Sequence, residues 1–252
     1  MGASPNLLLE LLVEELPPKA LRKLGEALAQ SLLASLKAQG LTDTQSVVTA
    51  YASPRRLAAH ITQVAPRAAD RPVRQKLMPV SVGLDTQGQP TPALLKKLQA
   101  LGVTDSASAV AALQRAPDGK AEALFYDSVA PGVDLASGLQ KALDEALAKL
   151  PIPKVMQYQL HSDCELPGWS SVNFVRPAHG LIALHGDQVV PVAALGLRAG
   201  RQTRGHRFEA QREVIEIADA DAYARTLLTQ GSVIAHFDER RAEIARQLAG
   251  AA

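Results

Sequence analysis

The fold is decided by residues 174–212, which read FVRPAHGLIALHGDQVVPVAALGLRAGRQTRGHRFEAQR. The first half has two short apolar runs within Leu181–Val192, on either side of His185-Gly186-Asp187. Because a Gly-Asp pair between two apolar runs is a turn signal, this half predicts a strand, a turn and a second strand. The second half, Arg198–Arg212, contains five arginines, one histidine and one acid. With histidine neutral, that segment carries a charge of +4.

The positive charge of the chain is concentrated in Arg198–Arg212. The whole chain has a net charge of only +2, so the residues outside this segment together carry −2. Guanidinium groups hold phosphate through two hydrogen bonds and keep their charge. A basic cluster in a nearly neutral chain therefore predicts an anionic ligand with several phosphates. The residues leave one alternative open, a solvated hairpin whose arginines pair with carboxylates elsewhere.

The glycines of this segment also favour a ligand site. Gly200 and Gly205 allow the backbone to approach a ligand closely, and they argue against a helix. If the segment is extended, alternation divides its cationic side chains between two faces. One face would carry Arg198, Arg204, His206 and Arg212, and the other Arg201 and Arg207.

The composition limits the function classes. At 252 residues, with 47% apolar residues, the chain can form one large domain or two ordinary ones. Aromatic residues make up only 4%, which weighs against recognition of bases by an aromatic platform and favours contacts to a nucleic-acid backbone. The single cysteine, Cys164, excludes an intrachain disulfide and suits a reducing cytosol. No apolar run approaches the roughly 20 residues that span a bilayer.

The first part of the chain predicts a strand, a helix and two strands. Asn6–Val13 is an apolar run that predicts a buried strand, and leucines then recur at helical spacing from Pro17 to Gly40. Two further strands are expected at Ser46–Ala52 and Leu57–Val64. The acids Glu14 and Glu15 are expected to interact with the positive end of the helix rather than to perform acid–base chemistry.

The later parts alternate between helices and strands. Between Arg67 and Arg74 the chain predicts a basic connector, and Ser106–Arg115 stays ambiguous. Loop, helix, strand and helix are then expected at Asp85–Pro92, Ala93–Leu101, Ala121–Val129 and Val133–Leu150. Further strands are expected at Val155–Leu160 and Glu213–Ile217, and helices at Asp219–Thr229 and Phe237–Leu248.

These patterns predict an α+β fold, with mixed or antiparallel sheets packed with helices in more than one subdomain. Residues 1–66 form the N-terminal strand–helix–strand–strand part. Residues 67–154 are expected to form a middle α+β subdomain. Residues 155–252 form a basic, β-rich part that ends in helices.

One cluster in the last part has metal-binding residue types. His161, Asp163, Cys164 and Glu165 lie within five residues of each other. Zinc sites need about four ligands, usually from two separated pairs, and no second pair is evident. A polar hairpin loop is the default interpretation, with a hydrolytic metal site as a weaker alternative.

Several short motifs, in order along the chain, resemble one family. The motifs are Glu14–Pro17 (EELP), Ser53–Leu57 (SPRRL), Leu150–Lys154 (LPIPK), Phe174–Pro177 (FVRP), Ala199–Arg201 (AGR), Thr203–Phe208 (TRGHRF) and Phe237–Arg241 (FDERR). On these residues the chain resembles, from end to end, the β subunit of bacterial heterotetrameric glycyl-tRNA synthetase. It departs from that family at Leu12-Val13, where Gly-Thr is usual.

The resemblance implies an N-terminal part of a longer β subunit, whose natural C-terminus is not expected at Ala252. It implies a cytoplasmic ligase that attaches glycine to tRNA(Gly) at the expense of ATP, with the catalytic site in the α subunit. The β subunit would contribute tRNA binding and subunit assembly. The implied partners are the α subunit, a second β subunit in an α2β2 tetramer, and tRNA(Gly). ATP and Mg would be used by the α subunit, so no catalytic, cofactor or metal residue is expected in this chain, and the chain alone is expected to be inactive.

The charge pattern and the resemblance together give a set of candidate RNA-binding residues. They are Arg55, Arg56, Arg176, Arg198, Arg201, Arg204, His206 and Arg207. The alternative is a protein–protein assembly module with no direct RNA contact, in which these arginines meet acidic groups of another subunit.

Overall fold

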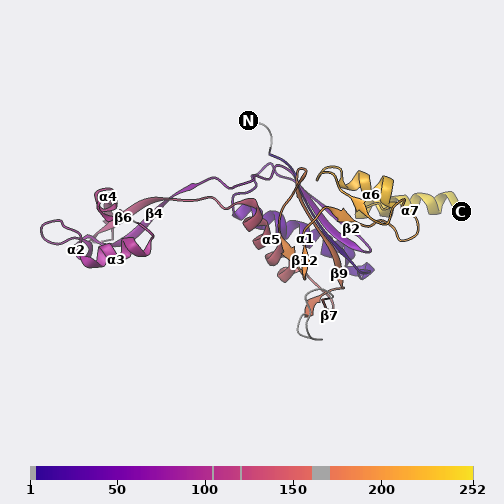
Figure 1. Cartoon of the computed structure of the whole chain (residues 1–252), viewed down its shortest axis with the longest axis horizontal. Helices are drawn as coiled ribbons and strands as arrows, with labels where there is room; N and C mark the ends of the chain where they lie inside the picture. Colours follow the sequence, from indigo (N-terminus) through magenta and orange to yellow (C-terminus); the bar gives the residue numbers. More distant parts are fainter. Residues whose placement is uncertain (1–3, 104, 120, 161–170, 252) are drawn as a thin grey trace. The chain divides into compact units, whose positions relative to one another are not determined.

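The computed structural model describes residues 4–103, 105–119, 121–160 and 171–251 (Figure 1). These residues form two compact units. The first unit combines Met1–Ala68 with Val133–Ala252, and the second is Ala69–Gly132. Both units contain helices and antiparallel sheets, so the α+β prediction is confirmed.

A five-stranded sheet forms the centre of the first unit, in the order β10-β9-β1-β3-β2. Its strands are β1 (Leu7–Val13), β2 (Val48–Ser53), β3 (Arg56–Ile61), β9 (Ala178–His185) and β10 (Gln188–Val189). Every residue of β1 is buried, because helices cover both faces of the sheet, and this explains the apolar run in the sequence. The β9–β10 hairpin turns at Gly186, whose φ of +59° confirms the predicted turn.

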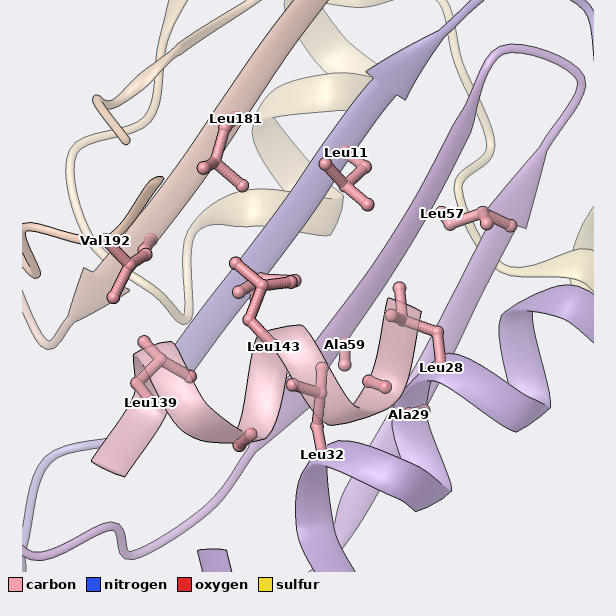
Figure 2. Packing of buried hydrophobic residues seen from close by; sticks show 14 of the residues in the cluster. Leu11, Leu28, Ala29, Leu32, Leu57, Ala59, Leu139, Leu143, Leu181 and Val192 are labelled. Carbon is pink, nitrogen blue, oxygen red and sulfur yellow. The ribbon is translucent and has the colours of Figure 1, made fainter. Parts of the chain in front are cut away.

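Two helices cover one face of this sheet. These are α1 (Pro18–Ala38) and α5 (Leu135–Lys149), which pack against each other. Figure 2 shows Leu28 and Leu32 of α1 beside Leu143 of α5, facing Leu11 on β1. Because strand side chains alternate between faces, the odd-numbered residues of β1 belong to this core.

The other face of the sheet packs on α6 (Tyr223–Gly231) and on β14 (Ile215–Glu216). Leu8, Ile182 and Leu184 point to this side and meet Tyr223. The predicted helix at 219–229 begins later than expected, because the Asp219 side chain accepts hydrogen bonds from the next turn at Asp221 and Ala222.

The remaining elements of the first unit are short, except for the last helix. They are β7 (Met156–Gln159), β8 (Ser171–Phe174), β11 (Ala193–Ala194), β12 (Leu197–Arg198), β13 (Gln202–Thr203) and α7 (Phe237–Ala251). The segment 198–212 is therefore mostly turns and loops, and the division of its cations between two faces of one extended strand is wrong.

The second unit is a three-stranded sheet, in the order β4-β6-β5, with three short helices. Its elements are β4 (Arg71–Pro79), α2 (Val80–Gly83), α3 (Pro92–Ala100), α4 (Ser106–Ala111), β5 (Gln114–Asp118) and β6 (Ala121–Ala130). Leu94, Leu98 and Leu124 form its small core. The basic segment that was expected to be a connector runs into β4, whose mostly exposed side chains give no clear alternation.

Within the described ranges, none of the helices combines the length and apolar character needed to cross a lipid bilayer.

The α1–α5 layer gives a test of the core. Leu28 is fully buried, so Leu28→Ala should lower the free energy of unfolding by about 2–5 kcal/mol, through lost burial and the cavity left behind. Urea denaturation followed by circular dichroism measures this change. As a control, Leu248→Ala removes a side chain that is 68% exposed and should cost less than about 0.5 kcal/mol. Equal losses in the two variants would contradict this core.

Candidate functional site

A cleft of about 790 Å³ opens at one end of the sheet in the first unit. Its lining is rich in charge. It consists of Leu12, Glu14, Arg55, His179, Arg204, Gly205, His206, Arg207, Ala210, Arg212 and Glu213. We call it the arginine cleft. Its four arginines and two acids give a net charge of +2 with both histidines neutral.

The pairing of β1 brings separate parts of the chain to this cleft. In the register of β1, Leu12 lies opposite Arg56 on β3, and Val13 lies opposite Ala178 on β9. Because both pairings are antiparallel, the end of β1 meets the starts of its two neighbours. Glu14, Arg55 and His179 therefore lie together although they are far apart in sequence.

Glu14 contacts three side chains of the arginine cleft, those of two arginines and one histidine. Its Oε1 atom accepts from Arg55 Nη2 at 3.4 Å and lies 3.0 Å from His179 Nε2. Its Oε2 atom accepts from Arg207 Nη2 at 3.3 Å. The sequence had assigned Glu14 to the positive end of the following helix, but α1 has no acidic residue in its first turn. The structure instead places this carboxylate among cations in the cleft.

The loop after β13 is fixed to the C-terminal end of α6. The N–H of His206 donates to the carbonyl of Gly231 at 2.7 Å, and the N–H of Gln211 donates to Gln230 at 2.9 Å. A Cβ atom on Gly205 would lie 2.5 Å from the Gly231 backbone, so only glycine permits this close approach. The loop therefore presents Arg204 and Arg207 from a fixed backbone.

Three other charged residues of the arginine cleft are exposed. Arg204 Nη1 lies 3.1 Å from Glu213 Oε1, and both side chains are more than half exposed. An exposed ion pair of this kind contributes little to stability, so Arg204 can exchange its partner for a ligand. Arg212 lines the cleft from an exposed position.

A buried polar network lies beside the cleft. Glu10 on β1 is 1% exposed and accepts hydrogen bonds from the hydroxyls of Thr203 and Tyr223. Arg56 is 2% exposed, lies 3.8 Å from Glu10, and donates through Nη2 to the carbonyl of Arg204. The network thus connects the centre of the sheet to the backbone of the cleft loop.

The network also changes the pKa of Tyr223. Burial penalises the phenolate, and the neighbouring Glu10 carboxylate repels it. Both effects raise the pKa of Tyr223 well above its ordinary value. Tyr223 therefore remains a hydrogen-bond donor to Glu10 across the physiological pH range.

Comparison with known proteins identifies the family. A family model described as "Glycyl-tRNA synthetase beta subunit" matches residues 7–252. The chain belongs to the glycyl-tRNA synthetase β subunit family. The resemblance seen in the short sequence motifs is therefore confirmed.

Similar proteins carry the same family name. A protein of Polaromonas naphthalenivorans named "Glycine--tRNA ligase beta subunit" is 69% identical over 249 residues, which cover 98% of this chain and 35% of that protein. Proteins with that name from Paracidovorax citrulli and Dechloromonas aromatica are 67% and 65% identical, and they cover 98% and 99% of this chain. The chain spans about 35% of the length of each of these relatives.

The structure brings together four of the eight residues expected to bind RNA in this family member. Arg55, Arg204, His206 and Arg207 line the arginine cleft. Glu14, His179, Arg212 and Glu213 join them there, although the sequence analysis did not select these as binding residues. Arg212 could have been chosen from the basic segment, whereas His179 and Glu14 join the cleft only through strand pairing.

The other four expected residues lie outside the lining. Arg56 is buried and bonded within the molecule, so we leave it out of the candidate surface. Arg176 donates to the carbonyl of Glu15, and Arg201 donates to the carbonyls of Asp187 and Ala218. Arg198 is exposed but is not among the lining residues.

The described part of the chain offers no cluster of metal ligands. No group of three or more His, Cys, Asp and Glu residues there could hold a metal ion. The loop His161–Glu165 lies outside the described residues.

Tyr223→Phe tests the buried network through pH. The unfolded phenol loses its proton near pH 10, about its reference pKa, while the folded phenol keeps it, so the network loses stability as pH rises above that value. Above about pH 10 the free energy of unfolding of the unchanged protein should fall up to about 1.4 kcal/mol per pH unit more steeply than that of Tyr223→Phe. Urea denaturation at several alkaline pH values measures both slopes. Identical slopes would contradict the burial of this phenol beside Glu10 in the folded protein.

Proposed function

We propose that the arginine cleft binds phosphates of tRNA(Gly), as the tRNA-binding surface of a β subunit that supports the ATP-dependent attachment of glycine. The observation that carries this proposal is the convergence of Arg55, His179 and Arg207 on the Glu14 carboxylate. Side chains that gather around one anionic group from three directions also suit another anion of similar size. A phosphate oxygen accepts the same kind of hydrogen bond from the same donors.

The rest of the cleft extends this site beyond a single phosphate. Arg204 and Arg212 line the same cleft. Among the described residues, the only ion pair that Arg204 would lose on binding a phosphate is the exposed one with Glu213. A volume of about 790 Å³ accommodates more than one phosphate group of a chain. Contacts of this kind hold a nucleic-acid backbone in place without reading its sequence, so the cleft would position tRNA rather than identify it.

The remaining roles are assigned to partners. We assign glycine activation, with ATP and Mg, to the α subunit, and we assign no catalytic, cofactor or metal residue to this chain. The assembly is an α2β2 tetramer in the cytoplasm, where translation uses its product. The chain alone would be inactive, because its contribution is binding and support.

The salt dependence of tRNA binding tests the proposal. If about four phosphates are neutralised, the logarithm of affinity should fall with the logarithm of salt at a slope of about −3 to −4. Replacing Arg204, Arg207 and Arg212 by alanine should flatten that slope by roughly one unit per lost contact. Filter binding or fluorescence anisotropy with a tRNA(Gly) transcript, across a salt series, measures both slopes.

The chain offers a matched control for this triple variant. Arg115, Arg241 and Arg246 are exposed and lie outside the cleft, so their replacement removes the same total charge. The control should keep the slope of the unchanged protein. A slope that is equal in both triple variants would refute the proposed contact.

Glu14→Gln tests whether this carboxylate competes with the phosphates. Removing its charge leaves Arg55 and Arg207 available to a ligand, so tRNA affinity at low salt should rise about two- to fivefold. Glu15→Gln is the matched control, because this exposed neighbour carries the same charge but does not line the cleft. Equilibrium binding of the three proteins measures the difference. A fall in affinity for Glu14→Gln alone would show that Glu14 supports the ligand instead of competing with it.

A second candidate function is protein assembly without RNA contact. The observation that favours it is the exposure of Ile244 and Leu248, which lie one turn apart on α7, at 53% and 68%. Replacing Ile244 and Leu248 by alanine separates the two candidates when both tRNA binding and pull-down of the α subunit are measured. Loss of the α subunit with unchanged tRNA binding would favour assembly.

A further inference from the structure

Phe208 is the most exposed large apolar side chain in the described part of the protein, at 87%. The other three phenylalanine rings are either buried or in contact with guanidinium groups. Phe174 is buried, Phe125 is covered by a guanidinium 4.9 Å from its ring centre, and Phe237 is flanked by two guanidinium groups. An exposed aromatic ring forgoes the favourable free energy of burial. An exposed ring next to two residues of the arginine cleft therefore suggests a role in binding.

The ring is held outward by a local hydrogen-bonded turn. His206 Nδ1 accepts from the backbone N–H of Phe208 at 3.3 Å and from that of Glu209 at 3.2 Å. The His206 and Phe208 rings also meet edge to face, with centroids 6.1 Å apart and planes at 62°. These contacts fix the backbone that carries Phe208 while they leave the face of its ring open.

The turn itself is anchored to the rest of the fold. Ser232 Oγ donates to the carbonyl of Glu209 at 2.8 Å, and Gln211 Nε2 donates to the carbonyl of Thr229 at 2.9 Å. These two bonds follow Phe208 in the chain, and the bond from the His206 N–H to the Gly231 carbonyl precedes it, so the loop is tied to the end of α6 on both sides of the ring. A ring presented from an anchored loop loses little conformational entropy when it binds a ligand.

His206 joins this ring to the arginine cleft. The imidazole lines the cleft and contacts Phe208, and Arg207 lies between the two in sequence. A cationic groove beside an exposed aromatic ring is the combination that binds single-stranded nucleic acid, because phosphates follow the groove while a base stacks on the ring.

We propose that Phe208 stacks on a base of an unpaired RNA segment whose phosphates lie in the arginine cleft. This inference rests on the proposed function and narrows its ligand to single-stranded RNA. A base inside a duplex is already stacked on its neighbours and is not available to the ring, whereas an unpaired base is. Stacking on one aromatic side chain tolerates any base, so the site selects strandedness rather than sequence.

The test uses the whole 252-residue chain and two probes, a single-stranded 12-nucleotide RNA and the duplex that it forms with its complement. Phe208→Ala should weaken binding of the single strand about 5- to 150-fold and leave duplex binding nearly unchanged. The salt slope should stay the same, because no charge is removed. Phe208→Trp should restore the affinity, since its ring also stacks. Val129→Ala is the control for loss of an exposed apolar side chain elsewhere, since Val129 is 66% exposed and does not line the cleft, and circular dichroism confirms that each variant folds.

The outcomes separate this inference from the proposed function. If Phe208→Ala binds the single strand as well as the unchanged protein does, stacking is overturned, while the salt slopes of the arginine variants decide the phosphate contact independently. An equal loss of affinity for the single strand and for the duplex would also overturn the stacking inference, because a base inside a duplex is not available to the ring. If Phe208→Ala loses the α subunit in a pull-down but keeps RNA affinity, the ring is a protein contact and the inference fails.

Discussion

The antiparallel pairing of β1 with both of its neighbours is the constraint on which the candidate site depends. This pairing joins the end of β1 to the starts of β3 and β9, which come from widely separated parts of the chain. The bonds continue past the strands, since the N–H of Val13 donates to Arg55 and the N–H of Glu14 donates to Pro177. Backbone hydrogen bonds therefore hold Glu14, Arg55 and His179 at this end of the sheet. The α1–α5 layer buries one face of the sheet and so keeps its strands in register.

The buried carboxylate of Glu10 connects this sheet to the cleft loop. A carboxylate in an apolar layer is costly unless its oxygens are hydrogen-bonded, and here two hydroxyls and a nearby guanidinium supply the compensation. Its partners come from β13, α6 and β3, so the network joins three elements around one strand residue. Arg56 completes the connection by donating to the Arg204 backbone. Two nitrogen atoms of Arg56, Nε and Nη1, are buried without a hydrogen bond to any described residue. Burying Arg56 therefore costs free energy that its contacts with Glu10 and Arg204 offset only in part.

Local signals in the sequence were enough to predict the main elements of the first unit. Leucines at helical spacing predicted α1, and the Gly186-Asp187 turn predicted the β9–β10 hairpin. The cleft was predicted only in part, because charge concentration along the chain identified Arg204 and Arg207 but not Glu14. The role of Glu14 follows from pairing between distant strands, which no local pattern records. Arg56 shows the opposite error. Arg55 lies in the turn between β2 and β3 and reaches the cleft, whereas Arg56 is the first residue of β3 and is buried beside Glu10.

The tethered carboxylate of Glu14 has a consequence for which anions can occupy the cleft. A side chain fixed beside its cations competes at a high effective concentration, which a dilute free ion such as chloride or inorganic phosphate does not match. A polymer differs, because displacing Glu14 at one point is compensated by simultaneous contacts of its other phosphates with Arg204 and Arg212. If the cleft binds phosphates as proposed, it would therefore discriminate by valency. A ligand that carries several charges in one chain would displace Glu14 more readily than a small metabolic anion would.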